Sequence, residues 1–259
     1  MRIGFIGLGN MSSAIIEGLK NSKKFDLTNI YASGRDLEKL KRNTRRLDIN
    51  YCENNQSLID QVDLIFLGVK PEDLNNLKLD FKNKIVISMA AKTNLKTLIK
   101  LFGNRPFVRI MPNLNVAINQ GSIAYTSYQL NEEKNQEIIT LLNLLGKVWV
   151  IDETKFSGFV ALAGSLPALI YRFIDVISDT ATEAGYLKAE ALEIASHTIS
   201  SSATYLNQLK TTPKELITKV ASKNGTTEAG LIILNEKHFN EILSEAIRAI
   251  ILKDKKGNS

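Results

Sequence analysis

Two hydrophobic rhythms divide the chain. From the N-terminus to about residue 152, short runs of β-branched and other apolar residues alternate with segments whose apolar residues recur at helical spacing. This alternation predicts parallel β-α-β units with helices on both faces of one sheet. The expected strands are RIGFIG (2–7), NIYAS (29–33), INYC (49–52), DLIFLGV (63–69), KIVISM (84–89), FVRIM (107–111) and KVWVI (147–151), and the expected helices are 11–22, 36–44, 57–62 and 95–102.

After about residue 152 the pattern is helical only. Residues 156–184 carry apolar side chains at helical spacing, and Pro167 within this run is expected to kink or locally break the helix. The pair Thr212-Pro213 is a good helix start. Further helices are expected over 188–207, 213–221 and 227–253.

The helices of the second half are apolar around much of their circumference, as in LPALIYRFIDVI (166–177). A domain of this size is expected to bury such a surface against a second copy of the chain. We therefore predict an α/β protein with two domains. A Rossmann-type doubly wound sheet occupies residues 1–153, and an all-helical substrate and dimerisation domain occupies residues 154–259.

Composition and charge argue against several classes of protein. The formal net charge is +6, but the densest basic cluster, KLKRNTRR (39–46), lacks the interleaved aromatics of a nucleic-acid groove and fits a solvated helix face. Cys52 is the only cysteine and the two histidines have no second ligand at metal spacing, so neither a disulfide nor a metal site is expected. No apolar run approaches the roughly 18 residues of a membrane span, and no cleavable signal pattern precedes the first strand. We expect a cytoplasmic protein without nucleic-acid or membrane partners.

A glycine turn follows the first expected strand and opens the first helix. In GFIGLGNM (4–11), Gly7 permits the tight turn and Gly9 lets a pyrophosphate approach the amide donors of the helix N-terminus. The third position of the GxGxxG pattern is Ser12, so the pattern is partial. Its place at the start of a β-α-β array predicts dinucleotide binding, with contacts from Gly7, Leu8, Gly9, Asn10 and Met11.

The end of the second strand indicates which dinucleotide. Sites for NAD usually have an acid there for the ribose 2′-hydroxyl, whereas this chain has Ser33, Gly34 and Arg35. A hydroxyl and a guanidinium suit a 2′-phosphate, which arginine can hold with paired charge-assisted hydrogen bonds. The adjacent Asp36 is expected to cap the following helix. We predict NADP as the cofactor, with NADPH preferred over NADH.

Several separated motifs together resemble pyrroline-5-carboxylate reductase, and the resemblance runs nearly from end to end. It rests on GFIGLGNM, ASGR (32–35), ENNQSLIDQVDLIFLGVKPEDL (53–74), VRIMPN (108–113), LAGSLPALIYRFID (162–175) and ASKNGTTEAGL (221–231). The resemblance implies a Rossmann domain followed by a helical domain that interleaves with its partner in a dimer, and by analogy rings of dimers. It also implies hydride transfer from NADPH to the C=N carbon of 1-pyrroline-5-carboxylate, the last step of proline synthesis.

Further cofactor contacts are expected along the carboxyl ends of the strands. The resemblance assigns Asn55 and the triplet Val69, Lys70 and Pro71 to the cofactor site. Lys70 is either a contact to the nicotinamide ribose or a solvated loop lysine. Two small residues after the fifth strand would admit the nicotinamide ring, and three residues at the carboxyl end of the sixth strand would lie beside it. These are Ala90, Ala91, Met111, Pro112 and Asn113.

The polar segment before the helix EAGLIILNE is the expected substrate site. Backbone amides at a helix N-terminus can hold a carboxylate. The resemblance implies that Ser222, Gly225 and Thr226 hold the substrate carboxylate and that the Thr227 hydroxyl meets the imine nitrogen. The alternative is simple helix capping led by Thr226 or Thr227, a role compatible with anion binding.

The chain departs from the family's pattern at three places. Leu114-Asn115 stands where the family usually has Thr-Pro, Leu166 stands where it has Gly, and Lys223-Asn224 stands where it has Pro-Gly. These departures leave two alternatives open. One is a noncatalytic or regulatory relative, and the other is an NADP-dependent reductase of another small imine. A small hydroxy acid as substrate would need a helix lysine near Gly164-Ser165, and the sequence offers no good candidate.

Overall fold

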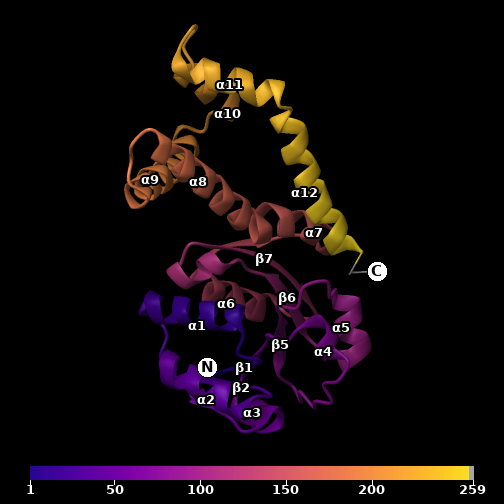
Figure 1. Ribbon diagram of the computed structural model, residues 1–259. Coiled ribbons are helices and arrows are strands. Elements are labelled where there is room, and N and C mark those ends of the chain that lie inside the picture. Colours follow the sequence, from indigo (N-terminus) through magenta and orange to yellow (C-terminus); the bar gives the residue numbers. More distant parts are fainter. Residues whose placement is uncertain (257–259) are drawn as a thin grey trace. The chain divides into compact units, whose positions relative to one another are not determined.

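The computed structural model describes residues 1–256 (Figure 1), so the last three residues of the predicted helical domain, 257–259, lie outside the described residues. One sheet of eight strands has the order β3-β2-β1-β4-β5-β6-β7-β8. All neighbouring strands are parallel except the pair β6 and β7. The strands are β1 (Ile3–Ile6), β2 (Ile30–Ser33), β3 (Asn50–Tyr51), β4 (Leu64–Leu67), β5 (Ile85–Ser88), β6 (Phe107–Met111), β7 (Gly121–Tyr128) and β8 (Gly146–Val150).

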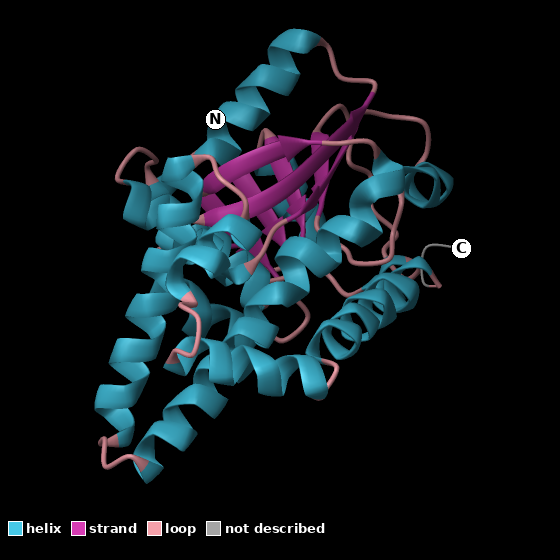
Figure 2. Cartoon of the chain, turned by 90° about the horizontal axis from the view of Figure 1, so that it is seen from above, coloured by secondary structure: helices cyan, strands magenta, loops and turns pink. Residues whose placement is uncertain are grey.

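Helices cover both faces of the sheet (Figure 2), which confirms the doubly wound fold. Successive residues of a strand point to opposite faces, so Phe5 and Phe66 pack with one layer of helices and Ile6 and Leu67 pack with the other. The first layer contains α1 (Asn10–Ser22), α2 (Leu37–Leu47) and α6 (Glu132–Asn143). The second layer contains α3 (Asn55–Gln61), α4 (Pro71–Leu74) and α5 (Leu95–Phe102).

Strand β7 was not predicted, and it makes the sheet mixed rather than wholly parallel. It runs antiparallel to β6, with Met111 opposite Ala124 and Phe107 opposite Tyr128. The connection is the short 3₁₀ segment η2 (Leu114–Ile118), because an antiparallel pair needs no crossover helix. Helix α6 then provides the crossover to β8, which pairs with β7 in parallel. The strand was missed because polar residues in its sequence, GSIAYTSY, interrupt the apolar runs by which the other strands were predicted.

The long helical run after β8 is interrupted before Pro167, as predicted. The segment η3 (Glu153–Lys155) and helix α7 (Phe156–Phe159) lead into a π-helical segment, η4 (Val160–Ser165). Helix α8 (Leu166–Glu183) follows and has the proline as its second residue. Proline lacks an N–H group and its ring crowds the carbonyl four residues earlier, so a wider turn accommodates it.

Residues Leu166–Ala249 form a second compact unit, separate from the unit made of residues up to Ser165 and from Ile250 onward. The predicted boundary at 153/154 follows the change from strands to helices and stays a prediction. Within this unit α8 packs against α9. Thr212 starts α10 with a capping box that includes Glu215, which confirms the predicted helix start. The remaining helices are α9 (Lys188–Leu209), α10 (Pro213–Val220), α11 (Thr226–Glu236) and α12 (Phe239–Lys255).

The single helix predicted over 227–253 was wrong, because the chain breaks at Lys237-His238. His238 has a φ of 54°, which ends α11 and lets α12 start in a new direction. One helical run, Glu153–Glu183, is long and apolar enough to cross a membrane by length and composition, and 11% of its most apolar window is buried. The sequence pattern did not predict this run as a candidate span.

Candidate functional site

The glycine turn after β1 is held on both sides by backbone hydrogen bonds. The Gly7 amide donates to the Ser33 carbonyl at 2.9 Å, and the Gly68 amide donates to the Ile6 carbonyl at 2.9 Å. Gly7 has a φ of 93°, and a Cβ there would lie 2.8 Å from the Gly68 carbonyl oxygen. Only glycine therefore fits at position 7.

Ser12, which occupies the third position of the partial fingerprint, is accommodated by Gly68, a glycine directly after the neighbouring strand β4. Its buried hydroxyl donates to the Gly7 carbonyl at 2.7 Å and braces the turn. A Cβ added to Gly68 would lie 2.3 Å from this hydroxyl. The close approach that the fingerprint needs is thus provided by Gly68 instead of by residue 12.

The N-terminus of α1 is open for an anion. Its N-cap is Gly9, with no side-chain capping bond, and a Cβ built on Gly9 would have no atom within 4 Å. The first-turn amides have no partner within the helix itself, and the helix dipole favours negative charge there. Asn10 is exposed and Met11 is half-buried at this end. The turn therefore fits a pyrophosphate, as the sequence predicted.

A pocket of about 490 Å³ lies over the carboxyl ends of β1, β2 and β4. Dinucleotides bind open parallel sheets at the same place, outside the carboxyl ends of the strands. The pocket brings together seven predicted cofactor residues, namely Gly7, Leu8, Gly9, Arg35, Asn55, Val69 and Lys70. It also contains residues that were not singled out for the cofactor, among them Gly34, Lys39, Asn43, Gly68, Asp73 and Leu77. Lys39 and Asn43 could have been found from their spacing of four, which places both on one face of α2.

The groups expected at a 2′-phosphate are already engaged with other side chains. The Ser33 hydroxyl is buried and donates to Asn55 Oδ1 at 2.8 Å. Arg35 makes two parallel hydrogen bonds of 2.9 Å to the carboxylate of Asp73. Asp36 caps α2 by accepting from the Lys39 amide at 2.9 Å, as predicted. Ser33 itself does not line the pocket.

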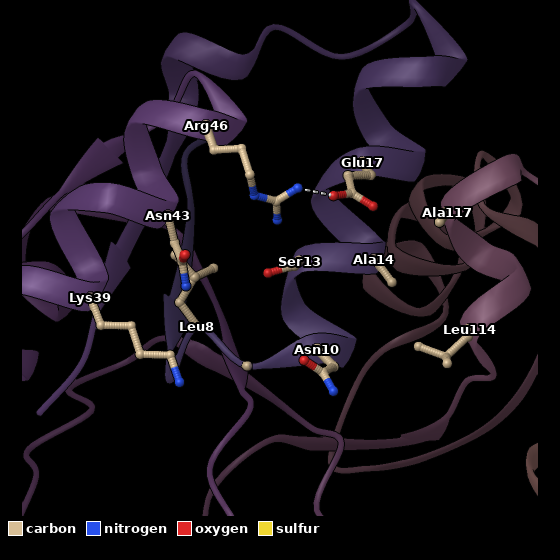
Figure 3. A pocket seen from close by; sticks show the side chains of 11 residues that line it. Leu8, Asn10, Ser13, Ala14, Glu17, Lys39, Asn43, Arg46, Leu114 and Ala117 are labelled. Atoms are coloured by element: carbon tan, nitrogen blue, oxygen red, sulfur yellow. Dashed lines mark hydrogen bonds and ion pairs between the residues drawn. The ribbon is translucent and has the colours of Figure 1, made fainter. Parts of the chain in front are cut away.

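A second hollow of about 540 Å³ adjoins the glycine turn between α1, α2 and η2 (Figure 3). Arg46 on α2 reaches across it to Glu17 on α1, with Nη1 and Oε1 2.6 Å apart. Leu114, which replaces the family's usual threonine, projects from η2 on the far side. The smaller pocket is the better dinucleotide site, because it lies over the strand ends and its lining includes the predicted residues.

The residues expected at the nicotinamide follow β5 or lie at the end of β6 and just after it, and they do not line the 490 Å³ pocket. Ala90 is buried and Ala91 is exposed. Asn113 is buried, and its side chain donates to the Ala163 carbonyl at 3.1 Å and accepts from the Ser122 amide at 3.2 Å. Asn113 therefore ties the end of β6 to β7 and η4. Met111 and Pro112 are buried beside it.

Lys70 and Pro71 occupy the turn between β4 and α4. The Lys70 side chain is 77% exposed and its Nζ lies 3.9 Å from Glu72 Oε1, a geometry typical of a solvated pair. Pro71 begins α4, where its missing N–H costs nothing. Lys70 lines the pocket, so both readings of this lysine stay open.

The predicted substrate segment lies in the helical unit, at the N-terminus of α11. The N-cap is Gly225, with no side-chain capping bond, so the capping role suggested for Thr226 or Thr227 was wrong. Both threonines are exposed. The Gly225 amide donates to the Ser222 carbonyl at 3.0 Å, and a Cβ on Gly225 would lie 2.5 Å from Ser222 Oγ. The segment is therefore a tight turn that leaves the start of a helix open for an anion.

Asn224 shows how the segment tolerates its departure from the family's pattern. Its φ is 60°, in the left-handed region, and its amide donates to Glu228 Oε2 at 2.6 Å. Asparagine is among the residues other than glycine that enter this region most readily. Asn224 can therefore replace the glycine expected there with the backbone turn retained. Lys223 beside it is exposed.

The described part of the chain, residues 1–256, contains no group of three His, Cys, Asp or Glu side chains arranged to hold a metal ion. The donor groups of both candidate sites are instead backbone amides, hydroxyls and cations. Such groups bind anions. A dinucleotide and a small carboxylate substrate both fit this chemistry.

Comparison with protein families assigns each part of the chain a class. Residues 2–92 match the family model described as NADP oxidoreductase, coenzyme F420-dependent. Residues 153–256 match the model described as pyrroline-5-carboxylate reductase dimerisation. The fold and these matches define an NADP-dependent oxidoreductase with a helical dimerisation domain.

Full-length relatives and solved structures identify the family. Pyrroline-5-carboxylate reductase of Aquifex aeolicus is 36% identical over 262 residues, covering 99% of this chain and 97% of the relative. A crystal structure of 1-pyrroline-5-carboxylate reductase from Streptococcus pyogenes has a TM-score of 0.93 at 39% identity, covering 99% of this chain and 98% of that one. The Plasmodium falciparum pyrroline carboxylate reductase with NADP bound has a TM-score of 0.91 at 26% identity, covering 100% and 98%. The chain belongs to the pyrroline-5-carboxylate reductase family.

Proposed function

We propose that this chain reduces 1-pyrroline-5-carboxylate to proline with NADPH in preference to NADH. The observation that carries the proposal is the pair of helix N-termini, at Gly9 and at Gly225, whose N-caps are glycines without side-chain capping bonds. One suits a pyrophosphate and the other suits a carboxylate. Membership of the reductase family supports the assignment of the two anions to cofactor and substrate.

The cofactor would be held by the turn Gly7–Met11 and by Asn55 and the triplet Val69–Pro71, with Arg35 at the 2′-phosphate. Ser33, expected at the phosphate, is buried and holds Asn55 instead. Ala90, Ala91, Met111, Pro112 and Asn113 would line the nicotinamide end. NADPH, when bound, supplies the hydride that the imine carbon accepts. The protein's own part is to bind both molecules, orient them and keep competing water away.

At the substrate, the proposed roles are divided along one turn. Ser222, Gly225 and Thr226 bind the carboxylate, and the Thr227 hydroxyl donates to or accepts from the imine nitrogen. A hydroxyl suits this position because it can both accept and donate a hydrogen bond. Proton transfer needs no paired carboxylates, since an imine nitrogen is basic enough to be protonated in water.

The exposed apolar side chains of the helical unit support assembly of two copies. Monomers rarely expose large apolar patches, and burial against a symmetric copy removes such side chains from water. The family's dimerisation model matches residues 153–256. This match favours a second copy of the chain, and not a membrane, as the partner that covers the apolar run Glu153–Glu183. We propose a homodimer, with rings of dimers by analogy, in the cytoplasm and without nucleic-acid partners. The side chains concerned include Phe173, Val176, Ile177, Leu192, Ile194, Ile232, Ile233 and Leu234.

One assay tests the function directly. Oxidation of NADPH is followed with 1-pyrroline-5-carboxylate as substrate, in the wild type, in Thr227→Ala and in Thr218→Ala. The last variant removes an exposed threonine hydroxyl from α10 and serves as a matched control. We expect turnover in the wild type and the control and a loss of at least tenfold in Thr227→Ala.

Absence of turnover in the wild type would support the two alternatives. A chain that binds NADPH and reduces a different cyclic imine would be a reductase of another substrate. A chain that binds NADPH and reduces none would be a noncatalytic relative. Full activity of Thr227→Ala would keep the reaction and remove Thr227 from it.

A further inference from the structure

We propose that Asp73 is a specificity-determining residue of the dinucleotide pocket, where it limits the preference for a 2′-phosphorylated cofactor by holding the forked end of Arg35. This inference rests on the proposed cofactor site. Both residues line the same pocket, Arg35 after β2 and Asp73 within α4 after β4. The two strands are separated in the sheet by β1.

The geometry of the pair leaves Arg35 only partly available. Nη1 donates to Oδ1 and Nη2 donates to Oδ2, each at 2.9 Å. This bidentate arrangement uses the two donors at the end of the guanidinium, the same donors that grip a phosphate face-on. The Arg35 side chain is 84% exposed, while that of Asp73 is 21% exposed. The carboxylate is thus the more buried member of the pair and the arginine is the more exposed one.

A 2′-phosphate must therefore either displace Asp73 from Arg35 or share the guanidinium with it. In both cases the phosphate comes close to a carboxylate of like charge, which costs free energy. A ribose 2′-hydroxyl has the opposite preference, because it can donate a hydrogen bond to a carboxylate. Sites for NAD use an acid from the end of the second strand in this way. Asp73 places an acid in this pocket from α4, the helix that follows a different strand, β4.

The other polar groups nearby do not replace this effect. Ser33 is engaged with Asn55, and the Asp36 carboxylate caps α2. Lys39 lines the pocket from α2 and adds positive charge without an ion pair to Asp73. The Arg35–Asp73 pair therefore mainly determines whether the pocket prefers a cofactor with a 2′-hydroxyl or one with a 2′-phosphate.

The test measures binding of two probes to the full-length wild type and to Asp73→Asn by calorimetry. Adenosine 2′,5′-bisphosphate carries the 2′-phosphate, and adenosine 5′-monophosphate lacks it. We expect the Kd for the bisphosphate to fall about three- to tenfold, the range of surface charge interactions, and the gain to shrink at high salt. The Kd for the monophosphate should stay the same or rise. An unchanged or weaker affinity for the bisphosphate, or an equal gain for both probes, would overturn the proposal.

Two controls isolate the cause. Asp60→Asn removes the same charge from an exposed pair with Lys82 outside this pocket, and it should change neither Kd. In an Arg35→Gln background, Asp73→Asn should raise the affinity for the bisphosphate less than twofold. An undiminished rise in affinity would show that Asp73 does not act through its pair with Arg35. The probes contain neither nicotinamide nor substrate. If the wild type does not prefer the bisphosphate, the proposed NADPH preference fails while the effect of Asp73→Asn is still measured.

Discussion

The buried Arg109 on β6 and the partly exposed Glu153 in η3 form an ion pair, with Nη1 and Oε1 2.8 Å apart. Arg109 is 1% exposed, and its guanidinium lies 4.5 Å from the centre of the Phe156 ring. The same Glu153 oxygen accepts a hydrogen bond from the Leu95 amide at 2.8 Å, at the start of α5. One carboxylate therefore joins three segments of the first unit.

Removing this carboxylate should strongly destabilise the protein. Glu153→Ala removes the carboxylate that pairs with the buried Arg109 guanidinium, and we expect a loss of about 2–4 kcal/mol in the free energy of unfolding, since breaking a buried pair costs about 3–5 kcal/mol and Glu153 is partly exposed. Urea unfolding followed by circular dichroism measures it. Arg109→Met combined with Glu153→Ala should cost less than the sum of the two single changes. Additive losses would show that the pair contributes nothing as a pair.

Gly68 and Ser12 should be energetically coupled. Gly68→Ala places a Cβ 2.3 Å from Ser12 Oγ and 2.9 Å from the Gly7 carbonyl oxygen, and we expect a loss of about 1–3 kcal/mol from overpacking. Ser12→Gly in the same chain removes the closer contact and should recover part of this loss. Thermal unfolding measures the loss of stability and its recovery, and NADP binding measures whether the turn keeps its shape. If Ser12→Gly recovers none of the lost stability, the added Cβ clashes with the Gly7 carbonyl and not with the Ser12 side chain.

Arg35 should matter for one cofactor and not for the other. Arg35→Gln removes charge-assisted hydrogen bonds to a 2′-phosphate, and we expect kcat/KM for NADPH to fall about tenfold, less than a buried contact would lose because the side chain is exposed. The value for NADH should stay within twofold. Steady-state rates with each cofactor give the ratio. A parallel loss with both cofactors would indicate a structural role.

The left-handed turn at Asn224 should tolerate glycine but not a branched residue. Asn224→Gly keeps the φ of 60°, so KM for the substrate should stay within about twofold. Asn224→Val must distort the turn, at a cost of about 1–2 kcal/mol or more, which should raise KM about tenfold. If the valine variant binds substrate normally, the turn does not form the carboxylate site.

The exposed apolar face of α8 should be needed for assembly. Phe173 and Val176 are 47% and 49% exposed, and changing both to Asp should give a monomer by light scattering coupled to size-exclusion chromatography. Trp149→Asp is the matched control, because Trp149 is 42% exposed but lies on β8 in the other unit. The control should remain dimeric. Loss of the dimer in the control alone would place the interface on the sheet.

Local patterns predicted the elements whose signals are local. The helix expected over 95–102 is found with the same bounds, and Asp36 caps α2 as predicted. Strand β7 was missed because its polar residues interrupt the apolar run and because its place between β6 and β8 is a tertiary property. The break between α11 and α12 at His238 was missed because the sequence carries no usual helix-ending signal there. No glycine or proline marks it, and a histidine takes the left-handed conformation.

The site was predictable where glycine geometry determines it and not where distant side chains meet. Gly7 and Gly9 follow from a strand, a turn and a helix in sequence. The pairing of Arg35 with Asp73 joins residues 38 positions apart and depends on β1 lying between their strands. The engagement of Ser33 with Asn55 depends on the fold in the same way. Sequence spacing carries no signal for either contact.

The contact between Ser12 and Gly68 has a consequence for how such chains are recognised. A helix can approach a strand closely if either one lacks a side chain at the contact, and here the residue without a side chain is Gly68, directly after the strand, and not residue 12 of the helix. Substitutions at the two positions should therefore occur as a linked pair across relatives, small at one when large at the other. A search that demands three glycines within one short motif overlooks members that have a serine at the third position and the compensating glycine at residue 68. A search that scores residues 12 and 68 jointly would retain them.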